Sequence, residues 1–184
     1  MIRLLHLNGP PGIGKSTLAR RFADEHPATL CCDIDVLRTL VGGWQEDFLG
    51  AGALVRPAAL VLIEAYLRTG HDVVLPQLLV NLEELSRFEG CATRSGAVFV
   101  ERVLMDDADA VVARFHRRGG NGRGDPWHDQ VRAIVAESGG DEVLLGYHAG
   151  LERLLRERPR AVRLPSVDGD PDRTYRALVD SLAG

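Results

Sequence analysis

One glycine-rich segment constrains the fold of this chain more than any other feature. Gly9 to Thr17 read Gly-Pro-Pro-Gly-Ile-Gly-Lys-Ser-Thr, after a short apolar stretch and before a segment of helical period. The segment matches the P-loop pattern, in which a glycine and four further residues precede Gly-Lys-Ser/Thr. This pattern connects a strand to the helix that follows it, so the N-terminal part of the chain is predicted to form a strand–loop–helix unit.

The rest of the chain alternates between strand and helix signals. Apolar segments bounded by turn residues alternate with longer segments of helical period, a pattern typical of parallel βαβ units. We expect strands at 3–7, 29–32, 72–75, 97–104 and 161–164, and helices at 15–25, 34–40, 56–68, 82–88, 108–118, 128–137, 142–157 and 171–182. The predicted fold class is α/β, a three-layer α/β/α arrangement with a five-stranded parallel sheet, in a single domain over residues 1–184.

Composition and charge limit the class of protein. The chain has 45% hydrophobic and 26% charged residues, values that exclude a disordered, collagen-like or disulfide-stapled protein. Its net charge of −4 gives no general attraction to nucleic acid or to an anionic membrane, although it leaves room for a local basic groove. The three cysteines have no paired spacing and fit a reducing compartment. We expect no signal peptide, no membrane-spanning segment and a cytoplasmic protein.

The glycine-rich segment predicts a phosphate-binding site. Its glycines permit backbone conformations in which successive N–H groups point at phosphate oxygens, and the start of the next helix adds the positive end of its dipole. Lys15 is the only lysine in a chain with 21 arginines, and a compact ammonium fits among phosphates where a planar guanidinium does not. A purely structural turn is the alternative, and it gives no reason for this lone lysine. We therefore expect ATP to be bound by Gly9, Pro10, Pro11, Gly12, Ile13, Gly14, Lys15, Ser16 and Thr17, with the Ser16 hydroxyl as a ligand of Mg²⁺.

Two carboxylates follow the second predicted strand, where the chain reads Cys-Asp-Ile-Asp-Val-Leu-Arg from Cys32 to Arg38. Phosphoryl transfer to an alcohol needs a carboxylate that accepts the hydroxyl proton and positive charge over the transferring group. We expect Asp35 to be this base, Asp33 to hold Mg²⁺ and Arg38 to bind the acceptor. The alternative is that Asp33 caps a helix and that Asp35 is a solvated acid of its first turn.

The P-loop and the Asp-x-Asp segment, Asp33 to Asp35, together resemble small-molecule kinases of the shikimate and gluconate kinase type. They are also similar to chloramphenicol phosphotransferase and zeta-toxin kinases, and the spacing from Asp35 to Arg38 resembles that of 5′-hydroxyl polynucleotide kinases. The resemblance is specific over roughly the first 40 residues. It implies a P-loop kinase fold, ATP and Mg²⁺ as cofactors, and a hydroxyl group as the phosphate acceptor.

The third predicted strand ends in Pro76 and Gln77, where many P-loop ATPases carry an acid that serves magnesium. The missing acid counts against motor-type ATPases and GTPases. Because ligands of α/β proteins bind at the carboxyl ends of the strands, Gln77 is a candidate for hydrogen bonds to acceptor hydroxyls. A polar residue that simply ends a strand is an equally good interpretation.

Arginines after the fourth predicted strand indicate a lid at about 114–128. Arg114 and Arg118 are four residues apart on a predicted helix, and Arg123 lies in the glycine-rich loop that follows. In the kinases that the chain resembles, an arginine-bearing lid closes over the phosphates, so we expect Arg114 and Arg118 to be catalytic cations. Solvated arginines that complement the helix dipole are the alternative. A second glycine-rich segment, 41–52, is a candidate flap.

The sequence thus favours an ATP- and Mg²⁺-dependent kinase that phosphorylates a hydroxyl of a small molecule. A polynucleotide 5′-kinase is one alternative, which the net negative charge disfavours. A P-loop regulator or ATPase without an acceptor is the other. The pair Asp33 and Asp35 argues against it, because a nucleotide switch needs no base for an alcohol.

Overall fold

The strand–loop–helix unit predicted at the N-terminus is present. Strand β1 (Arg3–Asn8) leads into the glycine-rich loop, and helix α1 (Lys15–Glu25) begins at Lys15. The computed structural model describes residues 1–118 and 126–183. The chain divides into two units, which we call the first unit (residues 1–8 and 15–102) and the second unit (residues 9–14 and 103–184).

Four further strands join β1 in a parallel sheet. These are β2 (Leu30–Cys31), β3 (Val73–Pro76), β4 (Val98–Met105) and β5 (Val162–Pro165), and the strand order is β2-β3-β1-β4-β5. In the first unit, Leu4 of β1 lies opposite Val73 of β3, and Val73 also lies opposite Leu30 of β2. All residues of β3 are buried, as expected of a strand covered on both faces. The predicted α/β class and the five-stranded parallel sheet are confirmed.

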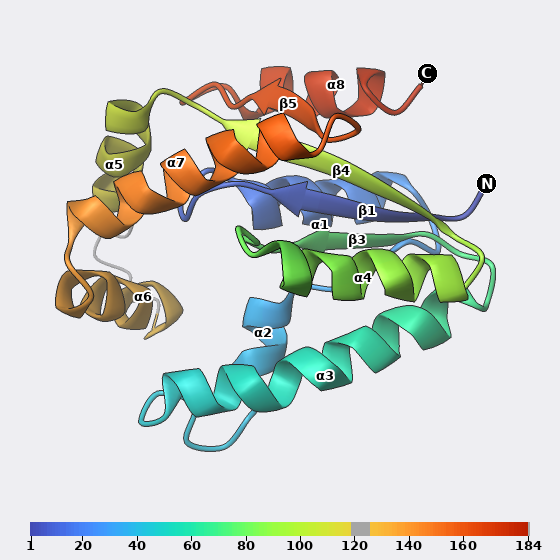
Figure 1. The fold of residues 1–184 in the computed structure, drawn as a ribbon, viewed down its shortest axis with the longest axis horizontal. Helices are drawn as coiled ribbons and strands as arrows, with labels where there is room; N and C mark the ends of the chain where they lie inside the picture. The colour runs from blue at the N-terminus through green and yellow to red at the C-terminus, as the bar shows by residue number, and fades with distance from the viewer. Residues whose placement is uncertain (119–125, 184) are drawn as a thin grey trace. The chain divides into compact units, whose positions relative to one another are not determined.

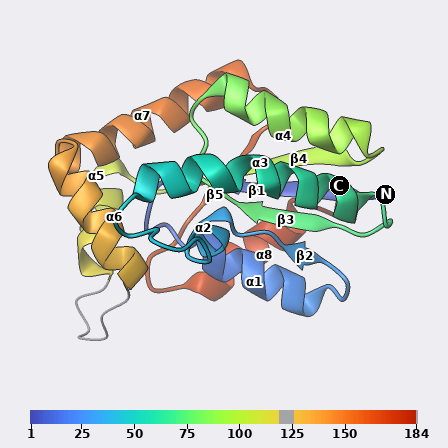
Figure 2. The ribbon, with the colours of Figure 1, turned by 90° about the horizontal axis from the view of Figure 1, so that it is seen from below.

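Helices cover both faces of the sheet in the first unit (Figure 2). Helix α1 contacts β1, β2 and β3, whereas α3 (Phe48–Leu67) contacts β3 and packs on α4 (Leu82–Arg94). Right-handed crossovers account for this, because β1–α1–β2 and β2–α3–β3 run across the sheet in opposite directions. Helix α4 continues beyond its predicted end at Phe88, because Cys91 and Ala92 extend its buried face.

Helix α3 begins earlier than the sequence predicted. We expected a flap over 41–52, which is rich in glycine, and a helix from Arg56. The helix instead begins at Phe48, where the Asp47 carboxylate accepts a hydrogen bond from the Gly50 N–H at 2.8 Å. It continues through Pro57, which lacks the N–H for a bond to the preceding turn. The flap prediction is therefore wrong for 48–52.

Helix α3 is also long and apolar enough to cross a membrane, by length and composition alone. Length and composition alone do not make α3 a membrane-spanning segment, so the expectation that there is none stays a prediction. In the structure, however, α3 buries Ala59, Ile63 and Leu67 completely and packs on β3 and α4. The same helix leaves Leu54 and Val61 each 70% exposed.

The second unit contains four helices among its described residues: α5 (Ala108–Arg117), α6 (Pro126–Glu137), α7 (Asp141–Glu157) and α8 (Pro171–Asp180), seen in Figure 1. Phe115, Val135 and Leu144 form the core between α5, α6 and α7, and α8 packs on β5. Asp170 caps α8, accepting a hydrogen bond from the Arg173 N–H at 2.9 Å. Much of the predicted lid, including Arg123, lies outside the described residues.

Candidate functional site

Three glycines of the glycine-rich loop have positive φ angles, and at two of them a side chain would also come close to neighbouring atoms. Gly9 and Gly12 have φ angles of +149° and +81°, which side-chain-bearing residues rarely adopt. A Cβ atom at Gly9 would lie 2.7 Å from the backbone oxygen of Leu104, and one at Gly12 would lie 3.3 Å from the Cα of Phe115. Within the second unit, the loop therefore sits close against the end of β4 and against α5.

The residues directly after the loop are those predicted to contact a nucleotide phosphate and its metal. Lys15 and Ser16 are half-buried at the start of α1, whereas Thr17 is exposed. Among the described residues, no group of three or more His, Cys, Asp or Glu residues could hold a metal ion. Magnesium in phosphoryl-transfer sites takes one or two protein ligands and completes its shell with phosphate oxygens and water. Ser16 and Asp33 therefore fit Mg²⁺ only together with a nucleotide.

Asp33 is the N-cap of the short helix α2 (Ile34–Arg38). Its side chain is buried, and Oδ1 accepts a hydrogen bond from the Asp35 N–H at 3.1 Å. Asp33 therefore caps the helix through one of its two carboxylate oxygens, as the alternative interpretation expected. A metal-binding role for Asp33 stays a prediction.

Asp35 is a carboxylate whose surroundings oppose its ionisation. Burial, and then the nearby Asp33 carboxylate, raise the pKa of Asp35 to about 6, against the smaller opposite effects of Arg38, Lys15 and Arg56. A carboxylate with a pKa near 6 is ionised at neutral pH yet basic enough to accept a proton in a transition state. These are the properties of a general base.

Arg38 is held in place by the start of α3. Its Cζ lies 4.1 Å from the centroid of the Phe48 ring, and a Cβ at Gly52 would come within 2.8 Å of its Nη2. Burial lowers the pKa of Arg38, whereas Asp35 raises it. The first unit thus brings the predicted residues Lys15, Asp33, Asp35 and Arg38 into one electrostatic group.

Arg56 belongs to the same group, and the sequence analysis missed it. It acts on Asp35 electrostatically and forms an ion pair with Glu84 of α4. The signal was available: Arg56 is the only charged residue between Phe48 and Ile63. A charge is rarely placed in such an apolar helix without a partner.

Gln77 follows β3 at the same edge of the sheet where Asp33 follows β2. Its backbone is fixed, because its N–H donates to the Leu7 carbonyl at 3.2 Å and its own carbonyl lies 2.9 Å from Nε2 of His6. Its Oε1 is buried and has no hydrogen-bond partner in the described part of the chain. A buried acceptor without a partner costs free energy unless a ligand supplies the donor. This is compatible with the predicted contact to acceptor hydroxyls.

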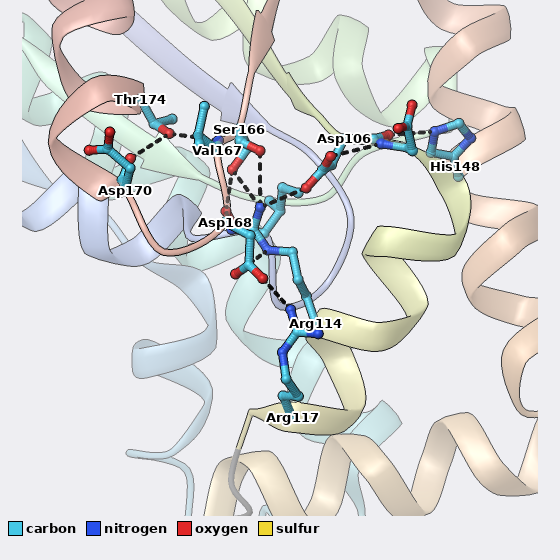
Figure 3. A network of polar contacts seen from close by, with 11 residues as sticks. Asp106, Arg114, Arg117, His148, Ser166, Val167, Asp168, Asp170 and Thr174 are labelled. Atoms are coloured by element: carbon cyan, nitrogen blue, oxygen red, sulfur yellow. Dashed lines mark hydrogen bonds and ion pairs between the residues drawn. The ribbon is translucent and has the colours of Figure 1, made fainter.

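Arg114 is the centre of a polar network in the second unit (Figure 3). Its Nη1 donates to Oδ2 of Asp106 at 3.0 Å and to both the Oγ and the carbonyl oxygen of Ser166 at 3.1 Å. Its Nη2 donates to the Ile13 carbonyl at 3.0 Å, and its Nε lies 3.6 Å from Asp168. The sequence did not identify Asp106 as a partner of Arg114. It also gave no sign that Arg114 and Ser166 both donate to the Ile13 carbonyl, because these contacts join distant parts of the chain. Arg114 as a catalytic cation stays a prediction.

Arg118 does not continue the helix that carries Arg114. Helix α5 ends at Arg117, and Arg118 has an extended backbone with φ −71° and ψ 116°. The helical spacing that would align Arg118 with Arg114 therefore ends one residue too early. Arg117 forms an ion pair with Asp168.

Comparison with known proteins places this geometry in a family. Residues 4–136 match the model of a family described as AAA domain. No match was found among curated proteins.

Two solved structures are similar over nearly the whole chain. A gluconokinase from Sinorhizobium meliloti 1021 has a TM-score of 0.60 at 18% identity, covering 98% of this chain and 93% of that one. A tunicamycin resistance protein from Deinococcus radiodurans has a TM-score of 0.58 at 17% identity, covering 98% of this chain and 96% of that one. At such identities the likeness shows the fold, and the predicted resemblance to P-loop kinases is confirmed at that level.

Proposed function

Since the chain belongs to the AAA domain family and has a P-loop kinase-like fold, we propose that it is an ATP- and Mg²⁺-dependent kinase that phosphorylates a hydroxyl of a small molecule. The observation that carries this proposal is Asp35. It is a carboxylate with a pKa of about 6 in the electrostatic field of Lys15, Arg38 and Arg56. A nucleotide switch without an acceptor has no use for such a base.

The glycine-rich loop and the residues after it bind ATP in this proposal. The N–H groups of Gly12, Ile13 and Gly14 and the Lys15 ammonium contact the phosphates, and Ser16 and Asp33 hold Mg²⁺. When bound, the metal neutralises charge on the phosphate oxygens. The lone lysine of the chain is thereby assigned to the position where a compact cation is needed.

Asp35 accepts the proton of the acceptor hydroxyl. The hydroxyl oxygen forms a bond to the γ-phosphorus as the bond from that phosphorus to the bridging oxygen of ADP breaks, so ADP leaves with the electron pair. Arg38 and Gln77 bind the acceptor, the first by charge and the second through its buried Oε1. Arg56 balances the charge of the two carboxylates.

The predicted lid supplies the remaining positive charge. We assign the lid to about 114–128, with Arg114 and Arg118 as its cations. We also propose that the protein is cytoplasmic. Preorganised cations over the transferring group stabilise charge that develops in the transition state. Part of this segment, residues 119–125, lies outside the described chain.

The direct test is transfer of labelled γ-phosphate from ATP to a panel of sugars, antibiotics, nucleosides and 5′-hydroxyl oligonucleotides. A thermal-shift screen with a non-hydrolysable ATP analogue selects the candidates, because a bound acceptor stabilises the folded protein by mass action. The proposal expects transfer to a small molecule in the wild type and loss of transfer in Asp35→Asn. Transfer only to oligonucleotides favours the polynucleotide kinase, and ATP hydrolysis that no acceptor changes favours the ATPase.

A further inference from the structure

The carbonyl oxygen of Ile13 accepts two hydrogen bonds from side chains far away in the sequence. One comes from Nη2 of Arg114 at 3.0 Å and the other from Oγ of Ser166, also at 3.0 Å. A carbonyl oxygen has two lone pairs, so both are used. Ile13 is 1% exposed and Ser166 is 4% exposed, which makes these bonds costly to lose. Two separate segments of the second unit thus converge on one peptide group of the glycine-rich loop.

The two donors are themselves fixed. The Ser166 N–H donates to the Met105 carbonyl at 2.8 Å, which extends the pairing of β5 with the end of β4. Arg114 is held by Asp106, whose own carbonyl oxygen lies 3.0 Å from Nε2 of His148 (Figure 3). In addition, Arg114 donates to the Ser166 hydroxyl, which leaves that hydroxyl's proton for Ile13. The donors therefore form a rigid clamp, which we call the Ile13 clamp (Arg114 and Ser166).

Holding the Ile13 carbonyl also orients the next amide. In a planar trans peptide the C=O and N–H bonds point in opposite directions. The Gly14 N–H, which shares this peptide with the Ile13 carbonyl, therefore points away from Arg114 and Ser166. Gly14 has a φ of +105°, and no heavy atom beyond its own residue and its two chain neighbours lies within 4 Å of the place where its Cβ would be. Arg114 and Ser166 therefore lie on one side of the Ile13–Gly14 peptide, and the Gly14 N–H points to the opposite side.

We propose that Arg114 and Ser166 are positioning residues that hold the Ile13–Gly14 peptide so that the Gly14 N–H donates to a phosphate of the bound nucleotide. This inference rests on the proposed function, because it needs a phosphate ligand at the loop. It gives Arg114 a task in addition to that of the lid cation proposed above. A lid cation acts on charge that develops during transfer, whereas the clamp prepares the loop before any nucleotide arrives.

The two roles predict different kinetic results. Loss of a lid cation lowers kcat and leaves the affinity for ADP unchanged. Loss of the clamp frees the peptide to rotate and weakens the binding of ADP, because a preformed amide donor is lost in the ground state. Ser166 gives the sharper test, since its hydroxyl is occupied by Arg114 and Ile13 on the protein side.

The peptide can be observed on its own, because Ile13–Gly14 is the only Ile–Gly sequence in the chain. Protein labelled with ¹³C at isoleucine carbonyls and ¹⁵N at glycine gives a single carbonyl–amide correlation in a triple-resonance NMR spectrum. We would record it without ligand for the wild type, Ser166→Ala, Arg114→Lys and the control Ser181→Ala. Ser181 makes a hydroxyl bond to the Leu178 carbonyl, within the same unit but remote in sequence from the loop. The dissociation constant for ADP with Mg²⁺ would be measured by calorimetry on the same four proteins.

The clamp predicts that the correlation moves in Ser166→Ala and Arg114→Lys and stays in place in Ser181→Ala. It also predicts ADP binding weaker by roughly tenfold in Ser166→Ala, for one lost hydrogen bond. Arg114→Lys keeps a charge but not the forked donors, so its binding falls by roughly tenfold to a hundredfold. The double variant loses less than the product of the two effects, because both act on one peptide.

Two results would overturn the inference. An unmoved correlation in both clamp variants means that the contacts do not hold the peptide. A moved correlation with unchanged affinity for ADP means that the peptide does not serve phosphate. If the wild type itself binds no ADP, the proposed function fails, and with it the phosphate role of the Gly14 N–H.

Discussion

Asp35 and Arg114, a residue of the Ile13 clamp, have opposite electrostatic surroundings. In the first unit, Asp35 is half-buried beside the Asp33 carboxylate, and its pKa rises to about 6 because ionisation is opposed. In the second unit, the cation Arg114 meets Asp106, Ser166 and Ile13 at hydrogen-bonding distances, so its charge and its donors are satisfied. A carboxylate with a raised pKa can change its protonation near neutral pH, whereas an arginine with hydrogen-bonded donors fixes the positions of the groups that it contacts. The difference separates the residue that we expect to react from those that we expect to position.

Asp35→Asn is the substitution from which we expect the largest effect on activity. The amide keeps the size of the carboxylate and much of its hydrogen bonding but cannot accept the acceptor's proton. We expect kcat to fall by roughly 10² to 10⁴-fold while ATP and Mg²⁺ bind nearly as before. Steady-state kinetics together with nucleotide calorimetry measure both quantities. Full activity in Asp35→Asn would reduce this residue to a helix-start acid.

Lys15→Arg tests whether the placement of a cation matters or only its charge. The chain uses arginine everywhere else, so this substitution makes the loop resemble the rest of the protein. Because a planar guanidinium does not fit among phosphates as an ammonium does, we expect a loss of roughly 10² to 10³-fold in transfer rate. The unfolding transition serves as the control and should be unchanged. Normal turnover would contradict the catalytic assignment of the loop.

Asp33→Asn separates the two carboxylates. A metal ligand can be replaced in part by mass action, so we expect roughly tenfold weaker apparent affinity for Mg²⁺ and recovery of turnover at high metal concentration. Turnover measured against Mg²⁺ concentration for both Asp variants decides the roles. Rescue of Asp35→Asn, with none for Asp33→Asn, would mean that the base and the ligand are exchanged.

The smallest expected effects concern stability, and they have opposite signs in the two regions. The pKa of Asp35 is raised from 3.8 to about 6, so its contribution to folding is greatest below its unfolded pKa and is lost as the pH rises through 6. Asp35→Asn should therefore stabilise the protein by about 2 kcal/mol at pH 8, with no gain at pH 3.5. Ser166→Ala should destabilise it by about 1 to 2 kcal/mol at both pH values.

Urea unfolding of the two variants at pH 8 and pH 3.5 checks these signs. If Asp35→Asn destabilises the protein at pH 8, the carboxylate is favourably placed and the contrast between the regions fails. A stabilising Ser166→Ala would equally contradict the clamp. Asp109→Asn, on the first turn of α5, is a matched control for removing one carboxylate.

Local signals predicted the elements, and distant contacts escaped them. The strand–loop–helix unit at the P-loop and the alternation of apolar and helical segments each depend on a few neighbouring residues, and these predictions agree with the structure. The start of α3 was misread because 41–52 is rich in glycine, whereas the helix begins at Phe48 after the Asp47 cap. The Ile13 clamp could not be predicted, since its residues are 101 and 153 positions from the carbonyl that they hold.

The candidate site shows the same division. The pattern from Asp33 to Arg38 was visible because all its residues lie in one turn of chain. Arg56 stands out as a lone charge in an apolar segment, but its effect on Asp35 was not visible, because that effect depends on how α3 packs against α2. The identity of the acceptor depends on such packing too, which is why sequence motifs assign the chemistry better than the substrate.

The rate of a single turnover, measured as a function of pH, shows whether Asp35 is the general base. With saturating ATP, Mg²⁺ and an acceptor from the panel, the account predicts a transfer rate that rises about tenfold per pH unit below pH 6 and levels off above it. In Asp35→Asn the residual rate should show no inflection near pH 6. An inflection near pH 6 that persists in Asp35→Asn, or a wild-type rate that does not change between pH 4.5 and pH 8, would contradict Asp35 as the base.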